Sequence, residues 1–256
     1  MNRFLTFTSG GCGSTYCIVS IAHLLGIPHL GAAFLPMYPE NYLTLTEGNF
    51  INCNPSVKNI KNQYSVSYDK NQNRIKLDKL TKATNGYILK VNEGGYSSLP
   101  KKEFDTYLQM QKPTRILLVR EDIEDLVLSR IFTHSTDIYA LQIDEQYPTV
   151  KLQPEDSFIR STTRNVAIQV KFLQNIYTKG EYDIFLKYED FIGDPNIDFK
   201  FVKSTKVIKP YYKKMLTIEQ KKERLVNFEH TLSLIREELY QCNVGSKFNF
   251  TVQLEN

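Results

Sequence analysis

The sequence predicts an α/β fold with three layers, α/β/α, around a central and mainly parallel sheet. Short apolar runs alternate with segments of helical periodicity along most of the chain. The first apolar run leads directly into a glycine-rich loop and then into a helical segment. Later apolar runs are four or five residues long and rich in β-favouring residues, which is typical of strands buried on both faces.

The first unit in chain order is a strand at about 3–8, followed by the loop and a helix at 14–25. Gly26 and Pro28 end this helix, because neither residue continues helical structure well. After residue 85 the alternation resumes. The remaining predicted elements are strands at 87–91, 115–119 and 182–186 and helices at 123–132, 162–177 and 218–240.

A different composition marks residues 30–85, which are rich in Asn, Lys and Tyr. Within them, alternating segments at 64–68 and 74–78 flank a Lys-Asn-Gln-Asn turn and predict a β-hairpin. A chain of 256 residues that is 41% hydrophobic can bury a sizeable core. We therefore expect one domain, 1–256, with a hairpin-containing insertion at about 30–85.

Charge and cysteine content narrow the range of functions. A net charge of +4, dispersed along the chain, is too small to indicate a nucleic-acid partner and favours a small anionic ligand. The four cysteines form no CxxC pair, so we expect no metal site and no disulfide framework. We also expect no signal peptide and no membrane-spanning segment, and hence a cytoplasmic protein.

The segment FTSGGCGSTYCIV, residues 7–19, has the composition of a P-loop-like anion site. After a parallel strand, backbone N–H groups and the positive end of the helix dipole converge on one point. Gly10, Gly11 and Gly13 let the backbone approach a ligand, and the hydroxyls at positions 14 and 15 add donors. A Walker loop needs a lysine where Gly13 stands, so ATP hydrolysis is disfavoured. A plain glycine-rich turn is the alternative interpretation.

A second signal is RILLVREDIEDLVLSR, residues 115–130. Arg120 directly follows the predicted strand, and Ser129 lies nine positions later on the next predicted helix. The guanidinium and the hydroxyl can clamp one phosphate from these positions, the guanidinium through bidentate charge-assisted hydrogen bonds. The alternative is a structural arginine beside an acidic helix start.

A third signal is FLKYEDFIGDP, residues 185–195, another strand that ends in an acidic turn. In this order the three segments resemble the family of PAPS-dependent sulfotransferases. The Arg-Glu-Asp-x(6)-Ser spacing resembles the bacterial carbohydrate and glycolipid branch of that family. NFEHTLSLI, residues 227–235, is similar to a segment near the end of these chains. The resemblance covers most of the chain and leaves about 30–85 unmatched.

The resemblance implies a site for PAPS, 3′-phosphoadenosine 5′-phosphosulfate. In it, Glu189 and Asp190 would mainly tie the turn after the third strand together. The residues implied for the nucleotide are Gly11, Cys12, Gly13, Ser14, Thr15 and Tyr16 at the 5′-phosphosulfate, Arg120 and Ser129 at the 3′-phosphate, and Tyr188 nearby.

The loop departs from the family at Gly11, where the family has an Arg or a Lys, and at Cys12, which replaces a Ser. Charge develops on the leaving phosphate oxygen during transfer, so a missing donor there typically costs on the order of 10²–10³ in rate. Either another cation reaches the loop or the transfer activity has been lost. The candidates for that cation are Lys90, Arg164, Lys213 and Lys214.

Lys90 and Glu93 are the predicted catalytic residues. The resemblance implies that the strand in GYILKVNEGG ends in the acceptor pocket, with a lysine two residues before a catalytic His. Asn92 occupies the His position here, so Glu93 is the expected general base, because a carboxylate in a partly dry cleft can accept a proton near neutral pH. A solvated Glu in a Gly-Gly turn is the alternative.

The sequence thus predicts sulfuryl transfer from PAPS to a hydroxyl or amine of a small molecule, glycan or lipid headgroup. The alternative is a non-catalytic descendant of the fold that binds a nucleotide or a protein. A P-loop kinase or ATPase is a third hypothesis, which the missing loop lysine argues against. We expect the basic run at 203–222 to be a solvated face, and the oligomeric state is left open.

Overall fold

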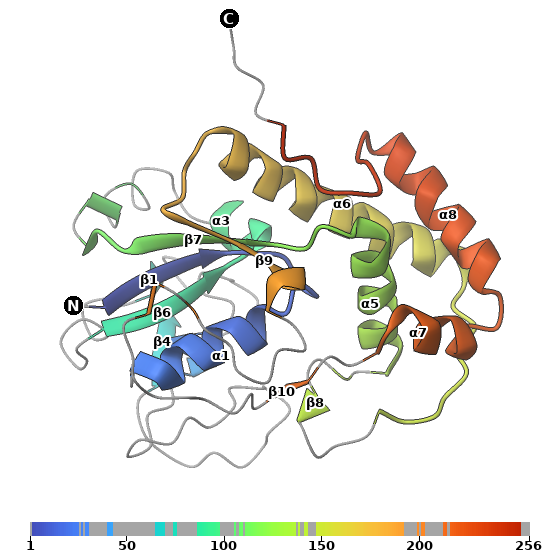
Figure 1. The fold of residues 1–256 in the computed structure, drawn as a ribbon, viewed down its shortest axis with the longest axis horizontal. Coiled ribbons are helices and arrows are strands. Elements are labelled where there is room, and N and C mark those ends of the chain that lie inside the picture. Colours follow the sequence, from blue (N-terminus) through green and yellow to red (C-terminus); the bar gives the residue numbers. More distant parts are fainter. Residues whose placement is uncertain are drawn as a thin grey trace, which may run out of the picture.

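The computed structural model describes residues 2–25, 27, 29–30, 40–42, 65–69, 74–75, 86–97, 105, 108–109, 111–136, 138, 141–142, 147–191, 199, 201–202, 212–213 and 216–251. Its elements are shown in Figure 1. In chain order they are β1 (Asn2–Phe7), α1 (Ser14–Leu25), β2 (His29–Leu30), β3 (Glu40–Tyr42), β4 (Ser65–Asp69), β5 (Arg74–Ile75), β6 (Gly86–Val91), α3 (Glu93–Ser97), β7 (Thr114–Val119), α5 (Ile123–Thr136), β8 (Leu141–Gln142), α6 (Asp156–Thr178), β9 (Ile184–Lys187), the 3-10 helix η1 (Tyr188–Asp190), β10 (Tyr212–Lys213), α7 (Ile218–Arg224) and α8 (Phe228–Gln241).

The main sheet has the strand order β2-β6-β1-β7-β9, and each neighbouring pair runs parallel. An α/β fold with a parallel sheet is therefore confirmed. β1 lies at the centre, with Phe7 paired to Val91 of β6 and to Leu117 of β7. Because parallel strands end at the same edge, the segments that follow β1, β6 and β7 meet there (Figure 1).

Both faces of β1 are packed, and its last four residues, 4–7, are all buried. The Phe7 ring contacts Phe172 of α6 and Tyr96 of α3, with centroids 6.2 and 6.4 Å away. Phe4 points to the opposite face by the two-residue period of a strand, and its ring contacts Phe201 at 6.4 Å. The sheet edge that carries the loop is thus held by a core on both sides.

Two smaller sheets accompany the main one. β3, β4 and β5 form an antiparallel sheet, in which Tyr68 pairs with Ile75 and Asp69 with Arg74. This pairing agrees with the hairpin expected at 64–78, of which residues 64, 70–73 and 76–78 lie outside the described residues. The second small sheet pairs β10 with β8.

The single helix expected at 218–240 is wrong, because two helices, α7 and α8, occupy this stretch. Leu225 leaves the helical conformation, with φ −94° and ψ 123°, and forms a parallel bridge with Leu152. The Leu152 N–H donates to the Arg224 carbonyl (2.7 Å), and the Val226 N–H donates to the Leu152 carbonyl (3.0 Å). These strand-like hydrogen bonds replace the helical ones that an uninterrupted helix would make.

Other boundaries shift by smaller amounts. α6 begins at Asp156 rather than at 162, and α5 runs on to Thr136. β9 starts at Ile184 rather than at 182, and α3 was not expected at all. Gly94 and Gly95 in the first turn of α3 are weak helix formers, so tertiary packing of Tyr96 rather than propensity accounts for this short helix.

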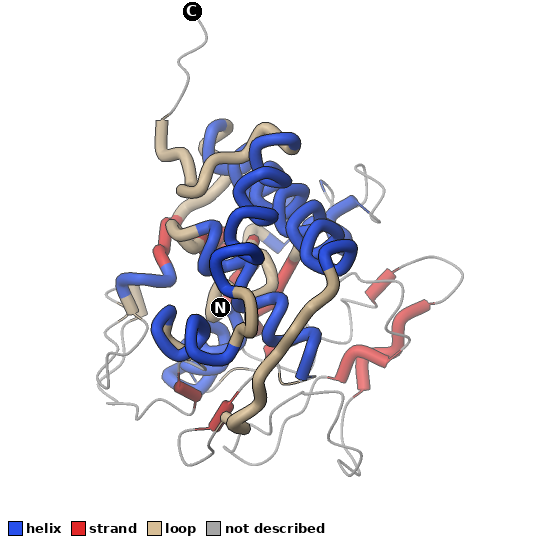
Figure 2. Tube along the Cα trace, turned by 90° about the vertical axis from the view of Figure 1, so that its right-hand side faces the viewer, coloured by secondary structure: helices blue, strands red, loops and turns tan. Residues whose placement is uncertain are grey.

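Helix α8 packs along α6 on the side of the molecule away from the amino-terminus (Figure 1). Its buried Glu238 accepts hydrogen bonds from Arg164 Nε (2.6 Å) and Arg160 Nη1 (3.3 Å) of α6. In the view turned by 90°, this helical side faces the reader (Figure 2). Among the described residues, no helix combines the length and the apolar character that crossing a membrane requires.

Candidate functional site

The loop at 8–13 joins the carboxyl end of β1 to the first turn of α1. It is anchored to the neighbouring strand β6 and to helix α6. The Thr8 N–H donates to the Val91 carbonyl of β6 (3.1 Å), and the Gly10 N–H donates to Gln169 Oε1 of α6 (3.1 Å). These bonds fix the entry of the loop, so that its position does not depend on a ligand.

The glycines of this loop adopt backbone conformations that other residues avoid. Gly11 and Gly13 have φ of +88° and +63°. The N–H groups of Gly11, Cys12, Gly13 and Ser14 have no acceptor among the residues that the structure describes. Unpaired N–H groups at the start of a helix, next to the positive end of its dipole, form the kind of surface that binds an anion.

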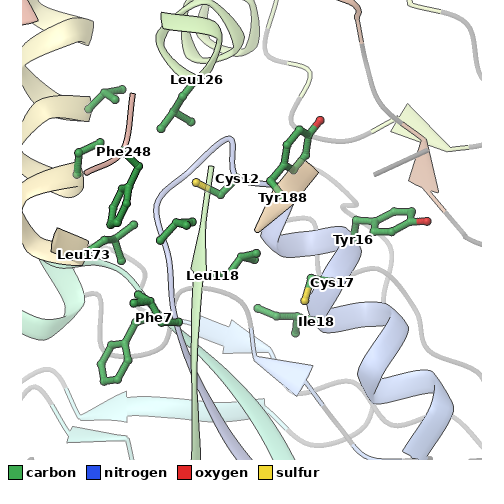
Figure 3. Close-up of a cluster of buried hydrophobic side chains, with 14 of the residues drawn as sticks. Phe7, Cys12, Tyr16, Cys17, Ile18, Leu118, Leu126, Leu173, Tyr188 and Phe248 are labelled. Carbon is green, nitrogen blue, oxygen red and sulfur yellow. The ribbon is translucent and has the colours of Figure 1, made fainter. Parts of the chain in front are cut away.

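Cys12 and Tyr16 turn their side chains inward from the loop. The Cys12 side chain is fully buried, its Sγ lies 2.8 Å from Ser9 Oγ, and Figure 3 shows its sulfur within the buried cluster. Burial raises the pKa of the Cys12 thiol, against the lowering effects of Ser9 and Arg120. The Tyr16 ring stacks on Phe191 at 5.9 Å. The side chains of both residues therefore contribute to packing.

Arg120 connects the end of β7 with the loop and with α5. Its side chain is buried, since the residue is only 3% exposed. Nη1 donates to the Gly11 carbonyl (3.0 Å) and to Ser129 Oγ (2.9 Å), and Nη2 pairs with the Asp125 carboxylate. The guanidinium carbon lies 4.4 Å from the centre of the Tyr188 ring. Nε is buried without a hydrogen-bond partner among the described residues.

Lys221 of α7 completes this cluster, contrary to the expectation of a solvated basic face at 203–222. The residue is 2% exposed, and its Nζ donates to Ser129 Oγ (2.7 Å) and pairs with the Asp125 carboxylate. Sequence reasoning missed this burial, because Ile218, the apolar residue one turn earlier in α7, is exposed and does not indicate which face of the helix is buried.

The turn after β9, which is η1, also contacts this cluster. The Tyr188 ring packs on Gly13, and burial raises the pKa of Tyr188 to about 12 although Arg120 lowers it. The Glu189 carboxylate accepts hydrogen bonds from the N–H groups of Glu121 (3.0 Å) and Asp122 (3.4 Å). Glu189 thus fastens this turn to the segment that follows Arg120.

A second pair of cations, Arg130 and Lys90, lies near the loop at the Gly10 end. Arg130 of α5 covers Gly10, since a Cβ added to that glycine would lie 2.8 Å from the guanidinium carbon. Lys90, paired with Thr6 in the sheet register, has its pKa lowered to about 8, first by burial and then by the charge of Arg130. Sequence reasoning missed Arg130, because its reach to the loop depends on how α5 is oriented.

The other predicted residues are placed as follows. Glu93 opens α3 at the sheet edge, half-buried, and its Oε1 accepts a hydrogen bond from Ser97 Oγ (2.6 Å). Arg164 is bonded to Glu238 of α8 rather than to the loop. Lys214 lies outside the described residues, and so do the side chains of Thr15 and Lys213.

Two buried cations, Arg120 and Lys221, share the single carboxylate of Asp125 in this site. Both also hydrogen-bond to Ser129. We expect Asp125→Asn to lower the unfolding free energy by about 3–5 kcal/mol, because the variant leaves two buried charges without a counter-charge. Inorganic phosphate should then raise the melting temperature of the variant more than that of the unaltered protein.

This expectation is checked by thermal melts in a phosphate series at constant ionic strength. Chloride at matched ionic strength is the control. An equal phosphate response of both proteins would show that no anion can take the place of the carboxylate.

Comparison with protein-family models, curated proteins and solved structures found no match for this chain. Within the described residues there is also no group of three or more His, Cys, Asp or Glu side chains placed to hold a metal ion.

Proposed function

We propose that this chain is a PAPS-dependent sulfotransferase built on a three-layer, P-loop-like α/β/α fold. One observation carries the proposal. Arg120 from the end of β7 and Ser129 from α5 are hydrogen-bonded to each other and meet the loop at Gly11. The family resemblance assigns these two residues to one phosphate beside the loop. Their convergence supports that assignment, and the packing on both faces of β1 supports the three layers.

The 3′-phosphate would bind at the cluster around Arg120. Ser129 Oγ lies between the guanidinium of Arg120 and the ammonium of Lys221, at 2.9 and 2.7 Å. In this structure the negative charge that pairs with both cations is the Asp125 carboxylate of the protein itself. A phosphate would displace the carboxylate and gain charge-assisted hydrogen bonds from both cations. The buried Arg120 Nε offers one further donor.

The 5′ end of the nucleotide would lie against the unpaired N–H groups of residues 11–14. PAPS supplies the sulfuryl group when it is bound. In the transfer, the S–O bond to the 5′-phosphate would break while an S–O bond to an acceptor hydroxyl, or an S–N bond to an acceptor amine, forms, and the acceptor proton would go to Glu93. Glu93 follows β6 at the same sheet edge as the loop, which suits it to this role. The acceptor would be a small molecule, a glycan or a lipid headgroup.

A non-catalytic descendant of the fold that binds a nucleotide or a protein is the second candidate, and Gly11 favours it. No side-chain charge comes from the loop itself at the position where the family has an Arg or a Lys. Nucleotide binding without transfer would identify this second function.

Binding and transfer are tested separately. Adenosine 3′,5′-bisphosphate, the desulfated product, should raise the melting temperature, whereas 5′-ADP, which lacks the 3′-phosphate, should raise it much less. Mass spectrometry should then detect a gain of one sulfuryl group on a hydroxyl- or amine-bearing acceptor in the presence of PAPS, with loss of the product in Glu93→Gln. Equal shifts with both nucleotides, or a larger one with Mg-ATP, would contradict the proposal.

A further inference from the structure

The guanidinium of Arg130 lies against Gly10 in the loop at 8–13, a loop that contains no lysine or arginine. A Cβ at Gly10 would be 2.8 Å from Arg130 Cζ, and a Cβ at Gly11 would be 3.4 Å from Arg130 Cδ. Arg130 occupies the space that a side chain would fill at Gly10, whereas at Gly11 an added Cβ would first meet Leu126 Cδ1 at 2.8 Å and then the aliphatic part of Arg130. Glycines are needed here as much for the passage of this arginine as for the backbone conformation at Gly11.

Arg130 and Arg120 approach the loop at the same residue by different routes. Arg120 Nη1 bonds to the Gly11 carbonyl (3.0 Å), while the aliphatic part of Arg130 lies beside the Gly11 Cα. Since Arg130 directly follows Ser129 in α5, one helix supplies a residue to each part of the site. A third cation, Lys90, is close enough for its charge to interact with that of Arg130.

We propose that Arg130, reaching over Gly10 and Gly11 from α5, is the cation that holds the 5′-phosphate end of the nucleotide in place of a loop lysine, with Lys90 of β6 beside it. This inference rests on the proposed function. It assigns a residue that neither the loop motif nor the family resemblance indicates. A guanidinium fits the task, because it presents planar, bidentate donors to phosphate oxygens.

The electrostatics of Lys90 agree with this assignment. Burial and the neighbouring positive charge of Arg130 lower the pKa of Lys90 to about 8, and the Cys12 group partly opposes them. Among the described residues, the groups that shift this pKa include no carboxylate. Two cations held close together in a partly dry place repel each other, and a bound phosphate relieves this repulsion.

The test compares two nucleotides that differ only at the 5′ end. Calorimetry measures the affinity of the full chain and of Arg130→Met for adenosine 3′,5′-bisphosphate and for adenosine 3′-monophosphate. We expect the variant to bind the bisphosphate roughly 10- to 100-fold more weakly and the monophosphate as before. Arg236→Met is the matched control, since Arg236 of α8 is exposed and paired with Glu124. A melting curve confirms that each variant is folded.

Two results would overturn the inference: equal weakening for both nucleotides, or no weakening for either. If the unaltered chain binds neither nucleotide, the proposed function fails, and inorganic phosphate decides the inference by itself. A phosphate-induced rise in melting temperature that Arg130→Met abolishes keeps Arg130 as an anion-binding residue, and a rise unaffected by the variant rejects it.

The pH dependence of nucleotide binding tests the part that Lys90 plays in the 5′ site. Lys90 is mostly protonated at pH 7 and mostly neutral at pH 9, given its pKa of about 8. The preference for the bisphosphate over the monophosphate should therefore fall as the pH rises from 7 to 9. In Lys90→Met this fall should be absent, and its persistence would exclude Lys90 from the 5′ site.

Discussion

Arg120→Ala is expected to abolish the stabilisation by adenosine 3′,5′-bisphosphate and to weaken its binding by roughly 10²-fold or more. The variant loses the only side chain that bonds at once to Ser129, to Asp125 and to the loop carbonyl of Gly11 within the described chain. Each hydrogen bond from a charged group contributes about 1.5–3 kcal/mol, so the loss of two to the phosphate is sufficient for this effect. Calorimetry at constant salt measures it.

The same substitution should also lower the unfolding free energy by roughly 3 kcal/mol. This is near the lower end of what breaking a buried ion pair costs, because Lys221 still pairs with Asp125. Arg120→Lys serves as the control. It keeps the charge but loses the fork that reaches Gly11 and Ser129 together, so stability should recover more than nucleotide affinity. Full recovery of both would mean that only charge matters at this position.

Gly13→Ala is expected to lower the unfolding free energy by roughly 2–5 kcal/mol and to remove nucleotide binding. Gly13 has φ +63°, where a Cβ is strained, and the added Cβ would lie 2.6 Å from Cδ2 of the Tyr188 ring. The ring cannot give way freely, because it packs on Phe191 and lies over Arg120. Chemical denaturation measures the stability, and the bisphosphate melt measures binding.

Gly180→Ala separates the two causes of this loss. Gly180 has the same φ of +63°, but a Cβ there would meet nothing within 4 Å. Gly180→Ala should therefore cost only the backbone strain, about 1–2 kcal/mol, and should bind the nucleotide normally. If both variants lost the same stability, the contact between the loop and Tyr188 would contribute nothing, and the described packing of the site would be wrong.

The strands were predictable because a buried parallel strand leaves a clear apolar run. β1, β6 and β7 are found within one or two residues of their expected ranges. The break between α7 and α8 was not predictable, since it depends on hydrogen bonds with Leu152, 73 residues away in the chain from Leu225. A local pattern carries no information about such a distant partner.

The candidate site likewise has features that the sequence predicts and features that it does not. The meeting of Arg120, Ser129 and the loop follows from topology, because strands that end at one edge bring their loops together. The burial of Lys221 and the reach of Arg130 over Gly10 depend on how α7 and α5 pack. Sequence spacing fixes the face of a helix but not its direction against another element.

A crystal structure of the chain with adenosine 3′,5′-bisphosphate is the measurement that tests this account most directly. We predict the 3′-phosphate in contact with Arg120, Ser129 and Lys221, the Asp125 carboxylate displaced from Arg120, and the 5′-phosphate on the backbone of residues 11–14. A nucleotide bound elsewhere, or an Arg120–Asp125 pair left intact beside it, would contradict the account.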